Sequence, residues 1–321
     1  MTIEGQYDRW EALSREEHEI ARHLANAEQL KAFFPETDPD SHKGRNGQVM
    51  IIGGSPLFHG AGKLAAIAAS QITLGFASRV NDMVFFCSTP DNLRPAQEAL
   101  ETFIGVTRDQ AAEYLARVDA VLVGPGLMRE QDKFRPDTAG EPEVTLNLTR
   151  LALASGKRVV LDAGSLQVIS ASELKHKSSV IITPHRGEMR RLFGGEDADY
   201  LLKHQATFTE VCRIAERIQA IAGEYGITIL LKGPIDIIAH RDGWYFSPGG
   251  NAGMTKGGTG DVLAGVVTAL YARKDNPLGA AASGSFLTKR ASDNLAPDWG
   301  LFYNATDLAN ELATTLHKIV D

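Results

Sequence analysis

A glycine-rich turn late in the chain carries the most informative chemistry of this sequence. Gly257, Gly258 and Gly260 precede an apolar run with helical spacing. Glycines let main-chain N–H groups converge without interference from Cβ atoms, and the following helix adds its positive N-terminal end, so the turn favours a phosphate or a developing oxyanion. Asp261 stands in the first helical turn, where its carboxylate can act as a base on a substrate hydroxyl. The alternative is a plain turn before a helix.

Five other groups of small or polar residues follow short apolar runs. Their glycines allow a ligand to approach the main chain closely, and their charged side chains can orient a polar substrate or contact a nucleotide. These groups are Gly53-Gly54-Ser55, Gly124-Pro125-Gly126, Asp162, Thr183-Pro184-His185-Arg186-Gly187-Glu188 and Lys232-Gly233.

Each group also has a plain structural alternative. Small residues can serve the tight packing of a helix on a sheet, Asp162 can cap the following helix, and a lysine at a strand end is usually a solvated charge. Ordinary helix-start chemistry accounts for Pro184 and Glu188, but it does not account for His185.

The elements that must position these groups alternate between β and α patterns. Short β-rich runs separated by helical stretches predict an α/β fold with a mostly parallel central sheet and helices on both faces. Open sheets of this kind bind ligands outside the carboxyl ends of their strands, where these turns lie. The predicted strands are 49–52, 83–87, 120–123, 159–161, 180–182 and 229–231, followed by an antiparallel hairpin at 235–240 and 244–247.

The first forty residues differ from the remainder. We predict an N-terminal helical arm over 1–40 and one α/β domain over 41–321. The arm carries a narrow apolar stripe within one amphipathic helix that Pro35 ends, and the stripe consists of Ile20, Leu24, Ala27 and Leu30. Such an arm either packs on its own domain or contacts a neighbouring subunit.

Composition excludes several classes of function. The net charge of −7 and the absence of a dense Lys/Arg run argue against nucleic-acid or anionic-membrane partners. Cys87 and Cys212 lie far apart, without the pairings of a zinc site or a disulfide framework. The sequence has no long apolar run, no Gly-x-Ser-x-Gly elbow and no intact Gly-x-Gly-x-x-Gly fingerprint. We therefore expect a cytoplasmic protein in which phosphate recognition is local.

Taken in chain order, these groups resemble one enzyme family. Together with His42-Lys43-Gly44 and Leu161-Asp162-Ala163, they are similar to the ADP/ATP-dependent NAD(P)H-hydrate dehydratases of the ribokinase-like superfamily, over about residues 41–320. The resemblance implies a ribokinase-like three-layer sandwich and a repair lyase that restores NADH or NADPH from its hydrate, driven by nucleotide hydrolysis. It also implies that the ring hydroxyl is phosphorylated before phosphate leaves.

The resemblance assigns roles to individual residues. It implies that Asp261 is the catalytic base and that Glu188 lies near the phosphates and a magnesium ion. The residues implied to contact the hydrated dinucleotide are Ala61, Gly126, His185 and Asp261. The residues implied to contact ADP or ATP are Lys232, Gly233, Gly258, Thr259 and Gly260.

Three residues depart from the family pattern. Gly164 replaces an acidic residue, Asp236 replaces a threonine, and Lys256 replaces a small or hydroxyl residue. A carboxylate near a phosphate is unfavourable and an ammonium is favourable, so the preference between ADP and ATP stays open. We also expect a homo-oligomer, and a separate protein for any epimerisation of the hydrate.

Two other functions compete with the lyase. The same turn and base suit a kinase that phosphorylates a sugar or a vitamin-precursor alcohol. The three departures also suit a nucleotide-binding module without turnover. Assays with hydrated NADH and a nucleotide separate these alternatives.

Overall fold

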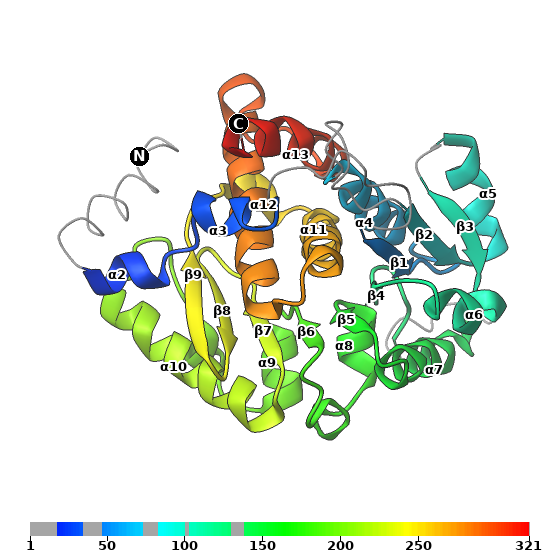
Figure 1. The fold of residues 1–321 in the computed structure, drawn as a ribbon, viewed down its shortest axis with the longest axis horizontal. Helices are drawn as coiled ribbons and strands as arrows, with labels where there is room; N and C mark the ends of the chain where they lie inside the picture. The colour runs from blue at the N-terminus through cyan, green and yellow to red at the C-terminus, as the bar shows by residue number, and fades with distance from the viewer. Residues whose placement is uncertain (1–17, 35–46, 73–82, 100–102, 130–137, 321) are drawn as a thin grey trace.

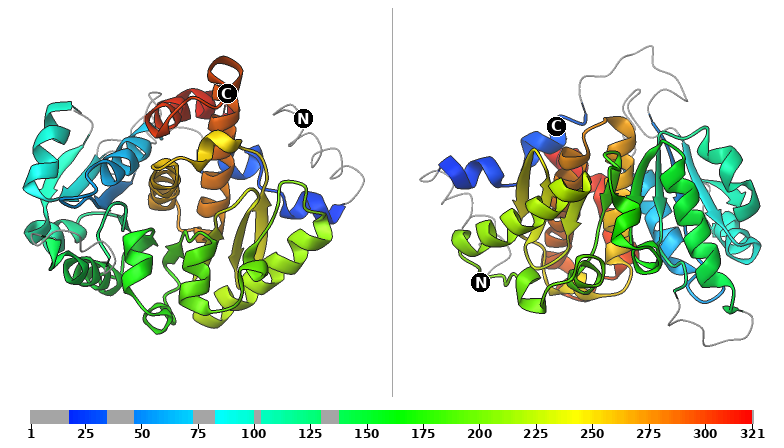
Figure 2. Two further views of the ribbon diagram at one scale, coloured as in Figure 1. Left: turned by 180° about the vertical axis from the view of Figure 1, so that it is seen from behind. Right: turned by 90° about the horizontal axis from the view of Figure 1, so that it is seen from below.

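The molecule is built in three layers. The computed structural model describes residues 18–34, 47–72, 83–99, 103–129 and 138–320. Within these residues a central sheet lies between two layers of helices, as Figure 1 and Figure 2 show from three directions. The predicted α/β sandwich with a mostly parallel sheet is therefore confirmed.

The sheet has nine strands in the order β3-β2-β1-β4-β5-β6-β7-β8-β9. Neighbours from β3 through β7 pair in parallel, whereas β8 runs antiparallel to both β7 and β9. The strands are β1 (Gln48–Ile52), β2 (Met83–Ser88), β3 (Ile104–Thr107), β4 (Ala120–Val123), β5 (Arg158–Leu161), β6 (Val180–Ile182), β7 (Thr228–Leu231), β8 (Asp236–His240) and β9 (Gly243–Ser247).

The central strands are apolar on both faces. Every residue of β4 and of β7 is buried, and β1 is buried from Val49 to Ile52. A continuous apolar run, without alternation, suits parallel strands that helices cover on both sides. Ligands therefore reach this sheet where its strands end.

The helices divide between the two faces. One face carries α3 (Ala27–Lys31), α4 (Gly60–Gln71), α5 (Pro90–Ala99), α11 (Thr259–Arg273), α12 (Pro277–Trp299) and α13 (Ala305–Val320). The other carries α2 (His18–His23), α6 (Ala111–Leu115), α7 (Glu141–Ala154), α8 (Gly164–Val168), α9 (Arg186–Phe193) and α10 (Phe208–Tyr225). Short 3-10 turns are η1 (Arg108–Gln110), η4 (Ala171–Leu174), η5 (Asp197–Tyr200) and η6 (Ala252–Thr255).

Helices α10 and α11 bury their surfaces in different ways. In α10 the buried residues recur at helical spacing along one stripe, and Gly226 ends the helix in the left-handed conformation. In α11 every residue from Val262 to Ala272 is buried, because this helix lies between the sheet, α4 and α12. Asp261 directly precedes that buried run, so the core of the protein fixes its position.

The described part of the N-terminal arm, residues 18–34, packs on its own sheet. Ala25 N donates to Phe246 O at 2.9 Å, and the ring of His23 stacks on Trp244 with 3.7 Å between centroids. The prediction of one continuous helix is wrong. Leu24 forms a bridge with Phe246 of edge strand β9, which breaks the helix, and Asn26 caps a second one.

One strand was missed by the sequence analysis. β3 is short, and of its four residues only Val106 is buried. Gly105 lies in the middle of the strand, so the segment lacks both an apolar run and a clear alternation. It joins the sheet through parallel pairing with β2, which the local sequence does not encode.

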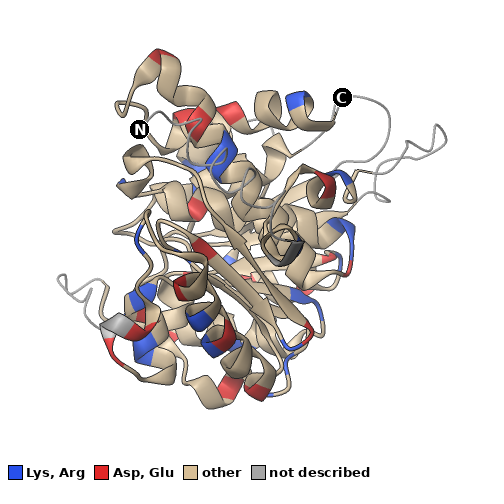
Figure 3. Cartoon of the chain, turned by 90° about the vertical axis from the view of Figure 1, so that its left-hand side faces the viewer, with Lys and Arg blue, Asp and Glu red and all other residues tan. Residues whose placement is uncertain are grey.

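The charged residues are dispersed over the surface. Figure 3 shows Lys and Arg interspersed with Asp and Glu on the helices. None of the helices in the described ranges combines the length and the apolar character that crossing a bilayer requires. The predicted segment His42-Lys43-Gly44 lies outside the described residues.

A glycine at the crossing of α4 and α11 generates a stability prediction. A Cβ atom added at Gly265 would lie 2.3 Å from Ala65 O, so the two helices must separate in a Gly265→Ala variant. We expect it to lose about 1–3 kcal/mol of unfolding free energy in urea, despite the helix propensity of alanine.

The matched control is Gly257→Ala, where the added Cβ would meet no atom within 4 Å. This variant should unfold like the wild type. Equal stability of all three proteins would contradict the close contact between α4 and α11.

Candidate functional site

The site lies where the strand order reverses. β1 and β4 are neighbours, but the chain leaves β1 toward β2 and leaves β4 toward β5, which is where open α/β sheets bind ligands. The two turns at this point touch: Gly54 N donates to Pro125 O at 2.8 Å. A Cβ at Gly53 would lie 2.5 Å from the same carbonyl oxygen. Glycine is therefore required here for a close approach of two backbones.

One cavity, which we name the Asp261 cavity, opens beside these turns and has a volume of about 300 Å³. All four residues implied to contact the hydrated dinucleotide line it: Ala61, Gly126, His185 and Asp261. Other lining residues include Asp162, Gly164, Gln167, Glu188 and Arg129. The sequence-derived group is thus brought together in space, although its binding role stays a prediction.

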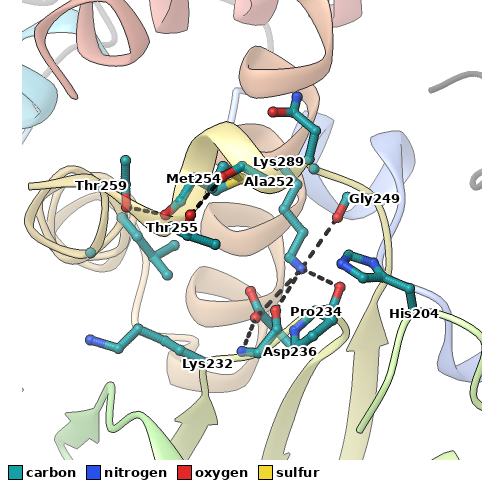
Figure 4. Close-up of a pocket in the computed structure, with 15 residues that line it drawn as sticks. His204, Lys232, Pro234, Asp236, Gly249, Ala252, Met254, Thr255, Thr259 and Lys289 are labelled. Atoms are coloured by element: carbon teal, nitrogen blue, oxygen red, sulfur yellow. Dashed lines mark hydrogen bonds and ion pairs between the residues drawn. The ribbon is translucent and has the colours of Figure 1, made fainter. Parts of the chain in front are cut away.

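A second cavity of about 340 Å³, which we name the Lys289 cavity, is lined in part by the turn before α11 (Figure 4). Four of the residues implied to contact the nucleotide line it: Lys232, Gly233, Thr259 and Gly260. Gly258 lines the Asp261 cavity instead. Lys232 and Gly260 line both cavities and mark the boundary between them.

The glycine-rich turn is shaped by close packing. Gly258 is the N-cap of α11 with φ of 100°, and an added Cβ would lie 2.7 Å from side-chain atoms of Ala305 and Leu64. The hydroxyl of Thr259 donates to Met254 O at 2.7 Å and to Lys256 O at 3.0 Å. The hydroxyl therefore closes the turn, while the helix N-terminus behind it supplies a positive potential.

An ion pair joins the ends of two strands. Lys232 Nζ, after β7, lies 2.6 Å from Asp162 Oδ1, after β5, and the hydroxyl of Thr183 donates to the same oxygen at 2.8 Å. Burial alone would lower the pKa of Lys232, but the charges of Asp162, Glu188 and Asp261 raise it. Asp162 is therefore a partner of the lysine, and Lys232 is a fixed cation between the cavities.

Asp261 has a carboxyl whose protonation is balanced near neutrality. Burial, followed by the negative charge of Asp162, raises its pKa to about 7, although the positive charge of Lys232 acts in the opposite direction. A general base works best when its pKa lies near the operating pH. Asp261 thus has a pKa suited to a base, and it lines the Asp261 cavity directly after Gly260, which lines both cavities.

His185 and Glu188 form a reciprocal helix cap. Glu188 N donates to His185 Nδ1 at 3.2 Å, and His185 N donates to Glu188 Oε2 at 2.9 Å. The interpretation that helix-start chemistry does not account for His185 is therefore wrong, because an imidazole nitrogen takes the place of a usual capping oxygen. The ring also lines the Asp261 cavity, so the cap fixes its orientation there.

Glu188 was expected near a magnesium ion. Its carboxylate is buried and also accepts from Gln167 Nε2 at 3.1 Å. The described residues hold no cluster of three or more His, Cys, Asp or Glu side chains suited to a metal ion. Mg²⁺ keeps several waters and takes substrate phosphates as ligands, so it does not need such a cluster, and the place of Glu188 beside an ion stays a prediction.

The three departures from the family pattern have structural explanations. A Cβ at Gly164 would lie 2.3 Å from Leu127 O, so this wall of the Asp261 cavity is bare backbone. The ammonium of Lys256 donates to the carbonyls of Leu301 and Tyr303 and is not among the residues that line either cavity. The carboxylate of Asp236 is paired with a lysine, Lys289, whose Nζ lies 3.5 Å from Asp236 Oδ1.

That lysine, Lys289, is a residue that the sequence analysis missed. It lies on α12 and lines the Lys289 cavity together with His204. Burial and the positive charge of Lys289 lower the pKa of His204. The one available signal was a lysine within the apolar face of a long helix, and it does not indicate a partner.

Comparisons with known proteins agree on one family. A family model described as NAD(P)H-hydrate dehydratase matches residues 49–314. The ADP-dependent (S)-NAD(P)H-hydrate dehydratase of Cenarchaeum symbiosum is 28% identical, over 92% of this chain and 98% of that relative.

Two solved structures share the fold. An ADP/ATP-dependent NAD(P)H-hydrate dehydratase from Bacillus subtilis, co-crystallized with ATP/Mg²⁺, has a TM-score of 0.72 and 23% identity, with 92% and 98% of the two chains covered. A ribokinase-like superfamily protein from Enterococcus faecalis has a TM-score of 0.73 and 22% identity, with 92% and 96% covered. The predicted ribokinase-like fold is thereby confirmed.

The charges around Asp261 generate a titration prediction. Carbon NMR of the labelled side-chain carboxyl groups should show one aspartate with a pKa of about 7, absent from the spectrum of Asp261→Asn. Asp162→Asn should lower this pKa because it removes a negative neighbour, and Lys232→Met should raise it. Titration of Asp261 at about pH 4, the ordinary aspartate range, would contradict the described electrostatics.

Proposed function

The chain belongs to the NAD(P)H-hydrate dehydratase family, and from that membership and the geometry of the site we propose that it removes water from hydrated NADH or NADPH in a reaction driven by an adenine nucleotide. The dehydration restores a usable cofactor, so the activity is one of metabolite repair. One observation carries this proposal: Asp261 lines one of two adjoining cavities and directly follows Gly260, which together with Lys232 lines both.

The first chemical step is a phosphoryl transfer. The hydrate lies in the Asp261 cavity and the nucleotide in the Lys289 cavity, with its terminal phosphate at Gly260. Asp261 accepts the proton of the ring hydroxyl, the hydroxyl oxygen bonds to the terminal phosphorus, and the bridging phosphate bond breaks toward the nucleotide. Lys232 and the main-chain N–H groups at the start of α11 stabilise the negative charge.

The second step is an elimination. The carbon–oxygen bond to the new phosphate breaks, phosphate leaves with the electron pair, and the neighbouring ring carbon loses a proton, which restores the double bond. The original hydroxyl oxygen therefore leaves within phosphate. The net reaction converts the hydrate and one nucleotide into the reduced cofactor, the nucleotide with one phosphate fewer, phosphate and a proton.

We include a magnesium ion in the proposal. When bound with the nucleotide it neutralises phosphate charge during transfer. Glu188, buried at the start of α9, would face the water ligands of this ion. The proposal also comprises a cytoplasmic location, a homo-oligomer and a separate epimerase.

The direct test supplies the purified protein with hydrated NADH and either ADP or ATP. We expect recovery of the absorbance of reduced nicotinamide, with one phosphate released per molecule restored. A stable phosphoester on another alcohol would identify a small-molecule kinase instead. Nucleotide binding with no turnover of either substrate would identify a binding module.

The Asp261→Asn variant tests whether Asp261 is the base. The amide keeps the shape of the side chain but cannot take up a proton, so kcat should fall by about 10²–10⁴. Nucleotide affinity, measured by calorimetry, should stay close to that of the wild type. A variant with the wild-type rate would show that another group removes the proton.

Gly260→Val tests the boundary between the cavities. A Cβ at Gly260 would have only Lys232 Nζ within 4 Å, at 3.5 Å, so the added methyl groups would enter the proposed phosphate position. We expect nucleotide affinity to fall about tenfold or more. Gly257→Ala is the control, because Gly257 lines neither cavity. Equal nucleotide affinities of the two variants would show that Gly260 is not part of the nucleotide site.

A further inference from the structure

A buried ion pair forms one wall of the Lys289 cavity. The side chains of Lys289 and Asp236 are 4% and 6% exposed, and Lys289 Nζ lies 3.5 Å from Asp236 Oδ1. The ammonium also donates to three main-chain carbonyls, those of Gly233 at 3.1 Å, Pro234 at 3.0 Å and Gly249 at 3.4 Å. Figure 4 shows Lys289 extending from α12 toward these groups.

Asp236 completes the network from the other side. Its Oδ1 accepts from Gly233 N at 2.8 Å, and its Oδ2 accepts from the hydroxyl of Ser285 at 2.7 Å. Both charges are therefore hydrogen-bonded as well as paired. Gly233 is held at its N–H by the carboxylate and at its carbonyl by the ammonium.

The network joins three separate segments. Gly233 and Pro234 follow β7, Gly249 follows β9, and Ser285 and Lys289 lie on α12. All of these except Ser285 line the Lys289 cavity, so the pair fixes the distance between opposite parts of its wall. Apolar contacts could join the same segments, but they would not fix the orientation of three carbonyl groups.

Energetics support a role in positioning. Replacing a buried ion pair with apolar residues is often neutral or stabilising, so such a pair is weak grounds for inferring stability alone. Removing one partner, by contrast, leaves an unpaired charge in the interior. The ion pair is therefore better explained by the shape that it gives to the wall of the Lys289 cavity.

We propose that Lys289 and Asp236 are positioning residues that hold the turn after β7 and the turn after β9 at the separation that the nucleotide requires. The proposal rests on the assignment of the Lys289 cavity to the nucleotide. It accounts for the carboxylate at position 236, because its charge faces a lysine and not the phosphates. Neither side chain takes part in the chemical step.

The experiment measures ADP binding by calorimetry and steady-state kinetics in parallel. Lys289→Met keeps most of the aliphatic chain and removes the ammonium. We expect ADP affinity to fall about tenfold or more, because the lost hydrogen bonds to the carbonyls of Gly233, Pro234 and Gly249 no longer hold the two turns at the required separation. The KM for the hydrate and kcat at saturating nucleotide should stay near the wild-type values.

Chemical rescue separates positioning from a general loss of structure. Lys289→Ala leaves the three carbonyls and the carboxylate around an empty space, so propylammonium in the buffer should restore much of the ADP affinity. Uncharged propanol should not. Lys256→Met is the matched control, since that lysine also donates to two carbonyls but does not line the cavity, and it should bind ADP like the wild type.

A double variant protects the test against misfolding. Lys289→Met with Asp236→Asn leaves no unpaired charge, and its ADP affinity should be no lower than that of Lys289→Met alone. Unchanged ADP affinity in the single variants, or an equal rise in KM for nucleotide and hydrate, would overturn the proposal. Binding is measured without turnover, so an inactive wild type that binds ADP would refute the dehydratase function and leave this inference standing.

Discussion

The ion pair between Lys232 and Asp162 is the interaction on which the site depends. It joins the carboxyl ends of β5 and β7 across β6, and Thr183, which follows β6, donates to the same carboxylate oxygen. Three neighbouring strands are thus fixed at one point. Burial and the negative charge of Asp162 raise the pKa of Asp261 to about 7, although the positive charge of Lys232 acts in the opposite direction. The cation proposed to bind phosphate and the carboxylate proposed as the base therefore arise from one arrangement.

Close contacts between backbone segments also position the site. Gly54 and Pro125 bring two turns together at the reversal of strand order, and Gly265 lets α11 lie close to α4. These contacts place the N-terminus of α11, with Asp261 in its first turn, at the boundary of both cavities. The positive end of the helix and the fixed lysine then act on the same volume, so little reorganisation is needed when charge develops.

The sequence predicted those parts of the molecule that local patterns encode. Six parallel strands and the hairpin follow from apolar runs and turn residues. The resemblance to a known family, not a local pattern, grouped Ala61, Gly126, His185 and Asp261, which the structure brings to one cavity. The partners of Asp162 and Asp236 were not predictable, because Lys232 and Lys289 lie far along the chain and meet them only through strand order and helix packing. For the same reason the break at Leu24 and strand β3 were missed.

In the proposed reaction, phosphate formed from the nucleotide carries away the oxygen of the substrate hydroxyl. The most direct measurement uses hydrate labelled with a heavy oxygen isotope in that hydroxyl, with mass spectrometry of the products after one turnover. Phosphorylation by way of Asp261 predicts that the label appears in inorganic phosphate. Label found in water, with unlabelled phosphate, would show that the hydroxyl leaves directly and would contradict the account.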